Sequence, residues 1–207
     1  MKRYITEFIG TFFLVLVIGL TVIAPGAGVM APLAIGGILM VMVYAGGHIS
    51  GAHYNPAVTF AVWLRGKCPG KDVAPYMLAQ IIGAALASWV ACSLKGACII
   101  AALNPGIKRA LIAEFIFTFA LVFVVLNTAF SKKTAGNSYY GLAIGLTLMT
   151  AIYAIGNISG GALNPAVAIG ITVMGLSKLG NLWLYIVGNL AGGALAAIVF
   201  RVVSPSD

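Results

Sequence analysis

Long apolar stretches alternate with short polar segments along this chain. Most of the stretches approach or exceed the ~20 residues that an α-helix needs to cross a bilayer. Six of them can be read, at about residues 4–24, 31–47, 73–94, 109–130, 139–156 and 179–203. The pattern predicts an all-α integral membrane protein with six transmembrane helices.

Two of the polar segments carry the same tripeptide. Asn55-Pro56-Ala57 recurs as Asn164-Pro165-Ala166, 109 residues later in a chain of 207 residues. Other residues match at the same spacing: Tyr44 and Tyr153, Gly47 and Gly156, Tyr76 and Tyr185, Gly83 and Gly192. We therefore expect one membrane channel domain over 1–207, made of repeat halves at about 1–95 and 109–207. Each half holds three helices, an odd number, so the second half should be inverted relative to the first.

A short apolar run follows each tripeptide. The runs, about 56–65 and 165–175, are too short to span a bilayer. Before them lie the segments 48–54 and 157–163, which are rich in Gly, Ser and Ala. We expect two re-entrant half-helices, each with Asn as N-cap and Pro at the first helical position. Inverted half-helices would bring Asn55 and Asn164 together at the membrane centre, with their amide NH2 groups available as donors.

Irregular backbone at that depth is tolerated only inside protein or beside a water-filled cavity. The segments before each Asn would then offer backbone carbonyl acceptors along a narrow path. The expected carbonyl positions are Gly51, Ala52, His53, Tyr54, Gly160 and Ala162. Since the positive ends of both half-helices converge there, cations and protons are disfavoured. Such a path suits a file of small neutral molecules.

Composition and charge narrow the class further. With 61% hydrophobic and 8% charged residues, the chain has too little polar surface for a soluble domain. Eight Lys and Arg side chains fall on the side of the termini and four on the other, which predicts cytoplasmic termini. The scattered cations argue against nucleic-acid binding. No cofactor or metal is expected, because the two histidines lack companion ligands and the three cysteines have no metal or redox spacing, and we expect inert thiols.

These motifs resemble those of the aquaporin, or major intrinsic protein, family over essentially the whole chain. The resemblance rests on His48-Ile49-Ser50-Gly51, His53, Asn55-Pro56-Ala57-Val58-Thr59, Ser159-Gly160, Asn164-Pro165-Ala166, Glu7-Phe8-Ile9-Gly10-Thr11 and Glu114-Phe115-Ile116-Phe117-Thr118. It implies an aquaporin-like fold and a homotetramer with one pore in each subunit, and we expect the chain to lie in the plasma membrane. It also implies that Glu7 and Glu114 brace the re-entrant loops by accepting backbone hydrogen bonds, and that His48 has a bracing role.

One position departs from the usual family pattern. Most members have Arg directly after the second tripeptide, in the outer constriction, whereas this chain has Val167. The resemblance places Ile35, Ile152 and Gly161 at the other constriction positions. This set is apolar and uncharged, so we expect a filter that is wider or less hydrated than a strict water filter.

The sequence thus predicts a passive channel for water, with small neutral solutes as further permeants. One alternative is a channel whose main cargo is glycerol, ammonia, hydrogen peroxide or another small neutral solute. An alternative of another class is a secondary transporter, since inverted repeats and broken helices occur there too. An enzyme is not expected, because no nucleophile–base pair or metal set falls near the path.

Overall fold

The computed structural model describes residues 1–96, 98 and 102–205, and all its regular elements there are helical. Within these residues, six helices are long and apolar enough to span a membrane, as the apolar stretches predict. They are α1 (Lys2–Val22), α2 (Ala31–Ser50), α4 (Gly70–Lys95), α5 (Ile107–Val125), α6 (Tyr140–Ser159) and α8 (Leu182–Val203). Two shorter ones, α3 (Pro56–Leu64) and α7 (Pro165–Val173), are the predicted half-helices. Short 3-10 or π turns extend several ends: Gly28–Met30, Leu126–Phe130, Lys132–Thr134 and Leu179–Asn181.

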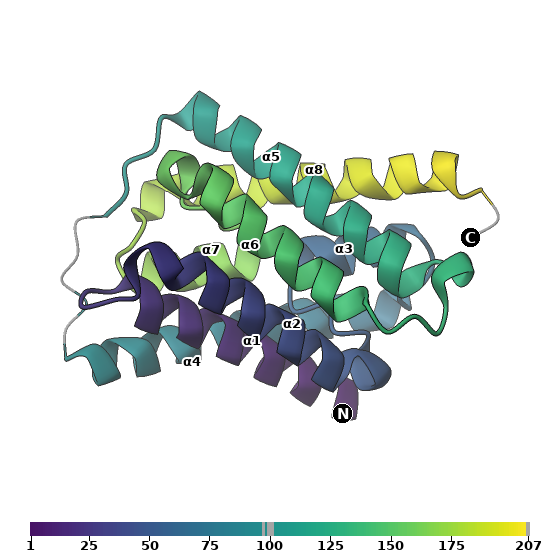
Figure 1. Ribbon diagram of the computed structural model, residues 1–207, viewed down its shortest axis with the longest axis horizontal. Helices are drawn as coiled ribbons and strands as arrows, with labels where there is room; N and C mark the ends of the chain where they lie inside the picture. Colours follow the sequence, from purple (N-terminus) through teal and green to yellow (C-terminus); the bar gives the residue numbers. More distant parts are fainter. Residues whose placement is uncertain (97, 99–101, 206–207) are drawn as a thin grey trace.

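The two halves pack in the same way. In the first half α1 lies against α4, in the second α5 lies against α8, and α2 crosses α6 between the halves. Each half-helix also packs on the last long helix of the other half, α3 on α8 and α7 on α4. Both termini lie at one end of the bundle, and α3 and α7 sit toward opposite ends (Figure 1). The fold is therefore the expected inverted repeat of three plus three spanning helices.

Matching glycines let the long helices approach closely. A Cβ atom at Gly83 on α4 would lie 2.6 Å from the carbonyl oxygen of Phe8 on α1. At the repeat-related site, a Cβ at Gly192 on α8 would collide with the carbonyl oxygen of Phe115 on α5. Small residues at helix contacts are the usual route to tight packing in lipid, where no hydrophobic force distinguishes helix from solvent.

The helices before the half-helices run further than the sequence suggested. The helices were expected to end where the polar segments begin, at residues 48 and 157, but α2 continues to Ser50 and α6 to Ser159. Each helix ends where the following glycine takes a left-handed conformation, with φ +88° at Gly51 and +94° at Gly160. Glycine adopts this conformation without the steric cost of a Cβ atom, which makes it the common helix terminator.

Beyond these glycines the backbone repeats an unusual conformation in both halves. Positive φ values recur at matching positions: Ala52 and Gly161, then Tyr54 and Leu163, with φ between +50° and +62°. Three of these four residues carry side chains, for which the left-handed region costs roughly 1–2 kcal/mol each. Such strain persists only where the surroundings hold the backbone in place.

In the first half, a buried glutamate on α1 holds this segment. Glu7 is fully buried, and its Oε1 atom accepts the backbone N–H of His53 at 3.0 Å while Oε2 accepts that of Tyr54 at 2.6 Å. The Ser50 hydroxyl donates to Oε1 at 2.7 Å and accepts the N–H of Ala52 at 3.1 Å. Gln80 on α4 donates to Oε2 at 2.8 Å. Every N–H from Ala52 to Tyr54 is thus paired on one side of this extended segment.

The second half repeats this arrangement around a glutamate on α5. Glu114 accepts the N–H groups of Ala162 at 3.0 Å and Leu163 at 2.8 Å. Ser159 donates to Oε1 at 2.7 Å and accepts the N–H of Gly161 at 3.1 Å. The fourth donor differs, because the shorter Asn189 stands where the first half has Gln80; its Oδ1 atom accepts from Thr118 at 3.0 Å.

His48 does not take part in these contacts. It lies on the last turn of α2 with an exposed side chain. No hydrogen bond from it to either re-entrant segment is found in the part of the chain that the structure describes. The bracing expected of His48 is therefore corrected: the hydroxyl of Ser50, two residues later, reaches the carboxylate because it points inward from the same turn.

The glycine contacts give a first prediction. Gly83→Ala should lower the free energy of unfolding by about 1–3 kcal/mol, since the new methyl group overlaps a backbone oxygen of α1 that cannot move aside. Gly37→Ala on α2 is the matched control, because a Cβ there meets no atom within 4 Å. Thermal unfolding of the detergent-purified chain measures both. Equal melting temperatures for the two variants would contradict the close approach of α1 and α4.

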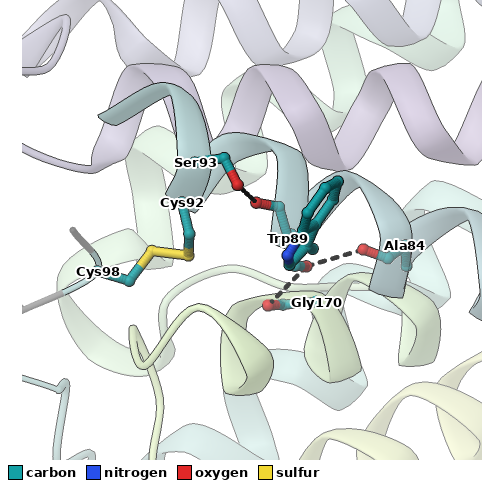
Figure 2. Close-up of a disulfide and its surroundings, with 7 residues drawn as sticks. Ala84, Trp89, Cys92, Ser93, Cys98 and Gly170 are labelled. Atoms are coloured by element: carbon teal, nitrogen blue, oxygen red, sulfur yellow. Dashed lines mark hydrogen bonds between the residues drawn. A yellow bond between two sulfur atoms is a disulfide. The ribbon is translucent and has the colours of Figure 1, made fainter. Parts of the chain in front are cut away.

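The carboxylate contacts give a second prediction. Glu7→Gln and Glu114→Gln should each cost roughly 1–3 kcal/mol of stability, because the amide NH2 faces a buried backbone N–H whichever way the side chain turns. Ser93→Ala serves as control, since this exposed hydroxyl donates to the carbonyl of Trp89 in its own helix and is far from both carboxylates in sequence (Figure 2). The unfolding temperatures of the three variants are compared, and those of the two Gln variants should be lower than that of Ser93→Ala. If the Gln variants melted with the Ser93 variant, the carboxylates would not hold the loops.

Candidate functional site

Two cavities adjoin each other inside the bundle, because several residues border both of them. The inner one has a volume of about 30 Å³ and is bordered by both Asn55 and Asn164. Since a water molecule needs about 10–15 Å³ of such space, this cavity holds only a very short file. The outer one has a volume of about 580 Å³ and opens toward the end that carries the α4–α5 loop. A wide mouth thus leads to a narrow centre.

The two asparagines join the half-helices at this centre. Each caps its own helix: Asn55 Oδ1 accepts the N–H of Ala57 at 2.8 Å, and Asn164 Oδ1 accepts that of Ala166 at 2.9 Å. Each also donates across to the opposite segment. Asn55 Nδ2 donates to the carbonyl of Leu163, and Asn164 Nδ2 to that of Tyr54, both at 2.8 Å.

These bonds between the two segments reduce the number of amide hydrogens that the asparagines can offer to a molecule in the cavity. An amide NH2 group has two hydrogens. One hydrogen of each asparagine is used by the other half of the chain, so one remains for a molecule in the cavity. Leu163, which was not among the expected carbonyl positions, supplies one of the two accepting oxygens. The tertiary pairing of the loops was needed to find it.

The direction of the backbone carbonyls follows from the glutamate contacts. In a trans peptide the C=O of one residue points opposite to the N–H of the next. Because the N–H groups of residues 52–54 point to Ser50 and Glu7, the carbonyls of Gly51, Ala52 and His53 point the other way. The same holds for residues 160–162 in the second half, so Gly161 joins Gly160 and Ala162 as a carbonyl position. The Tyr54 carbonyl instead accepts from Asn164.

The side chain of His53 lies on the inner side of the site. It is buried, with its Nδ1 atom 3.1 Å from the Thr59 hydroxyl and its ring packed against Tyr76 and Phe130. Thr59 donates its one hydrogen to the carbonyl of Asn55 and accepts from Gln80. The His53 contact is therefore satisfied when Nδ1 carries the proton and Nε2 is left as an acceptor.

The four expected constriction residues meet where the cavities join. Ile35, Ile152, Gly161 and Val167 border both the inner and the outer cavity, together with Ile18 and Ala162. Ile35 and Val167 are nearly fully buried. Gly161 lies against α6, where a Cβ atom would be 3.4 Å from the Cα of Ile152. The junction is formed by aliphatic side chains and backbone. Ile18 could have been found as the residue one turn beyond Leu14 on the buried face of α1.

The outer loop also contributes a wall that sequence reasoning missed. Leu103 borders the outer cavity. Its N–H donates to the carbonyl of Leu176 at 2.9 Å, and it bridges to Ser177. A Cβ at Gly160 would be 3.5 Å from its side chain. The loop is therefore pinned to the segment after α7, a contact over more than seventy residues of sequence that no local motif indicates.

A disulfide joins the loop to the end of α4. Cys92 and Cys98 are bonded, with Cα atoms 5.2 Å apart, while Cys68 is free and buried. Figure 2 shows this bond near the end of α4, with Gly170 of α7 close by. One turn before Cys92, the Ser88 hydroxyl donates to the carbonyl of Gly170 at 3.0 Å. The expectation of three inert thiols is thus wrong for two of them. Their pairing depends on how the loop turns back on the helix, which sequence spacing alone did not reveal.

Comparison with known proteins agrees with this architecture. The family model described as "Major intrinsic protein" matches residues 1–203. A glycerol uptake facilitator protein-like 6 of Lactiplantibacillus plantarum is 38% identical, with 100% of both chains covered. Aquaporin AqpM of Methanothermobacter thermautotrophicus is 37% identical, over 98% of this chain and 97% of the relative. The X-ray structure of the aquaglyceroporin from Plasmodium falciparum shares the fold, with a TM-score of 0.79, 21% identity and coverage of 99% and 97%. On these grounds the chain belongs to the major intrinsic protein family.

Proposed function

We propose that this chain is a passive channel for water that also admits small neutral solutes, with Ile35, Ile152, Gly161 and Val167 as its outer constriction. The single observation that carries the proposal is the narrow cavity at the asparagine pair, bordered outside by an aliphatic junction. Relatives named as aquaporins and as a glycerol uptake facilitator support both kinds of cargo.

The lining explains why the permeants should be neutral. Among the described residues, no Asp, Glu, Lys or Arg borders either of the two cavities. An ion entering the junction would lose its hydration with no charge to replace it, which costs far more than the dehydration of a neutral molecule. The buried Glu7 and Glu114 are engaged by the loops and do not border the cavities. Coupling to an ion gradient would need a charged side chain on the path, and residues of these four types do not border it in the part of the chain that the structure describes, so the channel is favoured.

A second candidate is a channel whose main cargo is a small solute such as glycerol, ammonia or hydrogen peroxide. The outer cavity of about 580 Å³ favours it, because a polyol can enter that space before reaching the junction. The absence of an arginine side chain at Val167 also leaves more room there. Water and glycerol fluxes measured side by side separate the two candidates.

We place both termini in the cytoplasm and the chain in the plasma membrane. Eight of the twelve basic residues lie at the end of the bundle with the termini. The Cys92–Cys98 disulfide joins the last turns of the third spanning helix to the loop that follows it, at the other end of the bundle. Disulfides persist in oxidising compartments, which supports an extracellular position for that end. One chain lines the whole path, consistent with a homotetramer in which every subunit has its own pore.

Stopped-flow light scattering on proteoliposomes tests the function. Water flux should exceed that of empty liposomes, rise linearly with the osmotic gradient and have a low activation energy. Glycerol flux is measured on the same vesicles. Saturable uptake that depends on an ion gradient would instead support a secondary transporter.

Val167→Arg should change the selectivity of the junction. The longer, charged side chain narrows the space, so glycerol flux should fall on the order of tenfold while water flux falls much less. Val167→Leu is the control for added volume without charge and should reduce glycerol less. Equal loss of both fluxes, or no change in either, would mean that Val167 does not border the constriction.

The unmodified chain should also exclude protons, although the constriction has no arginine. The two half-helices direct their positive ends at the centre, and each asparagine breaks the water file by donating to it. A pH-sensitive dye trapped in proteoliposomes measures the proton leak under an imposed pH gradient. The leak should equal that of protein-free vesicles; a leak that scales with the amount of channel would contradict this prediction.

A further inference from the structure

The residues that border the inner cavity are related in pairs by the repeat. Leu39 on α2 matches Leu148 on α6, and Leu14 on α1 matches Leu121 on α5. These four leucines border the same cavity as the asparagine pair. The cavity is therefore built around the same pseudo-symmetry as the chain, and its two ends can be compared residue by residue.

The outer junction has a counterpart for each of its members. Ile35 corresponds to Ile144, Ile152 to Val43, Gly161 to Ala52 and Val167 to Val58. All four counterparts border the inner cavity, and none borders the outer one. They are also nearly fully buried, between 2% and 6% exposed. The counterparts are as aliphatic as the junction itself.

Helix direction places these counterparts on the far side of the asparagines. Along α2, Ile35, Leu39 and Val43 follow one another at four-residue steps from the outer end inward. Along α6, Ile144, Leu148 and Ile152 run the opposite way. Four residues of α-helix rise by about 6 Å. The path thus has three levels. The junction residues form an outer aliphatic ring, the asparagines lie at the centre, and the four counterparts form an inner aliphatic ring on the side of the chain termini.

We propose that the inner ring of Val43, Ala52, Val58 and Ile144 is a second selectivity constriction, in series with the outer ring and of similar resistance. This proposal rests on the proposed channel function. A solute would lose hydrogen bonds at one ring, regain them at the asparagines and lose them again at the other. An arginine at Val167 would make the outer ring dominant; without it, the pseudo-symmetry of the lining gives neither ring precedence. His53, which stands where the second half of the chain has Ala162, borders the same cavity next to the inner ring and adds a polar side chain there.

Two barriers in series have a characteristic response to widening. Ile35→Ala opens the outer ring and Ile144→Ala the inner one, by the same change at repeat-related sites. Removing one of two equal resistances should raise glycerol flux only about twofold, whereas the double variant should gain on the order of tenfold, the scale on which a few methylenes alter passage through an apolar site. Ile116→Ala is the control and should leave glycerol flux unchanged, because this side chain on α5 is 50% exposed on the surface of the bundle, away from the path.

Narrowing provides a second variant pair that does not depend on opening the core. Val58→Leu should lower glycerol flux as much as Val167→Leu does, with water flux reduced less in both. The measurements use the full chain in proteoliposomes, with water flux as the check that each variant is folded and inserted.

The outcomes separate this proposal from the channel function. If Ile35→Ala alone gave the full gain and Ile144→Ala added nothing, the outer ring would be the sole constriction and the proposal would be overturned. A Val58→Leu variant with unchanged glycerol flux would also overturn it. Water flux of the unmodified chain no higher than that of empty liposomes would contradict the channel function itself.

Discussion

The structure depends on two buried carboxylates that satisfy peptide groups at the middle of the membrane. A non-helical backbone segment at that depth has N–H groups that need hydrogen-bond acceptors, and the lipid core offers none. Glu7 and Glu114 each accept two such N–H groups and a serine hydroxyl. Without them, leaving the helix at Gly51 and Gly160 would expose orphaned donors and leave the left-handed residues unsupported. The half-helices, the asparagine pair and the cavity all require those two exits.

Directing the N–H groups to one side also determines the chemistry of the other side. Because each peptide is planar, the carbonyls opposite the carboxylates are turned together toward the path. The asparagines then contribute the complementary donors, and by bonding to Tyr54 and Leu163 they lock the two halves to each other. One arrangement of buried acceptors therefore positions a row of carbonyls and a pair of amide donors, while mostly aliphatic side chains border the rest of the inner cavity.

The sequence alone was sufficient to predict the elements that depend on neighbouring residues. Apolar length predicted the six spans, and Asn before Pro predicted both half-helix starts, because capping depends on adjacent residues. The exits at Gly51 and Gly160 were placed about three residues early, since Gly and Ser are tolerated in a helix until tertiary acceptors favour an alternative. The cross-bonded asparagines, the Leu103 wall and the Cys92–Cys98 disulfide depend on contacts between distant segments. The spacing of residues along the sequence does not predict those contacts.

A duplicated chain produces a pseudo-symmetric path unless individual side chains make its two ends differ. In the described lining the aliphatic positions match in pairs, so the difference comes from polar substitutions around Glu7. His53, Thr59 and Gln80 form one hydrogen-bonded cluster there, whereas their repeat counterparts are Ala162, Ala168 and Asn189. An arginine after the second tripeptide would place the polar asymmetry at the outer end. With Val167 in that position, the polar asymmetry lies at the inner end instead, where His53 adds a side-chain acceptor to the carbonyl row.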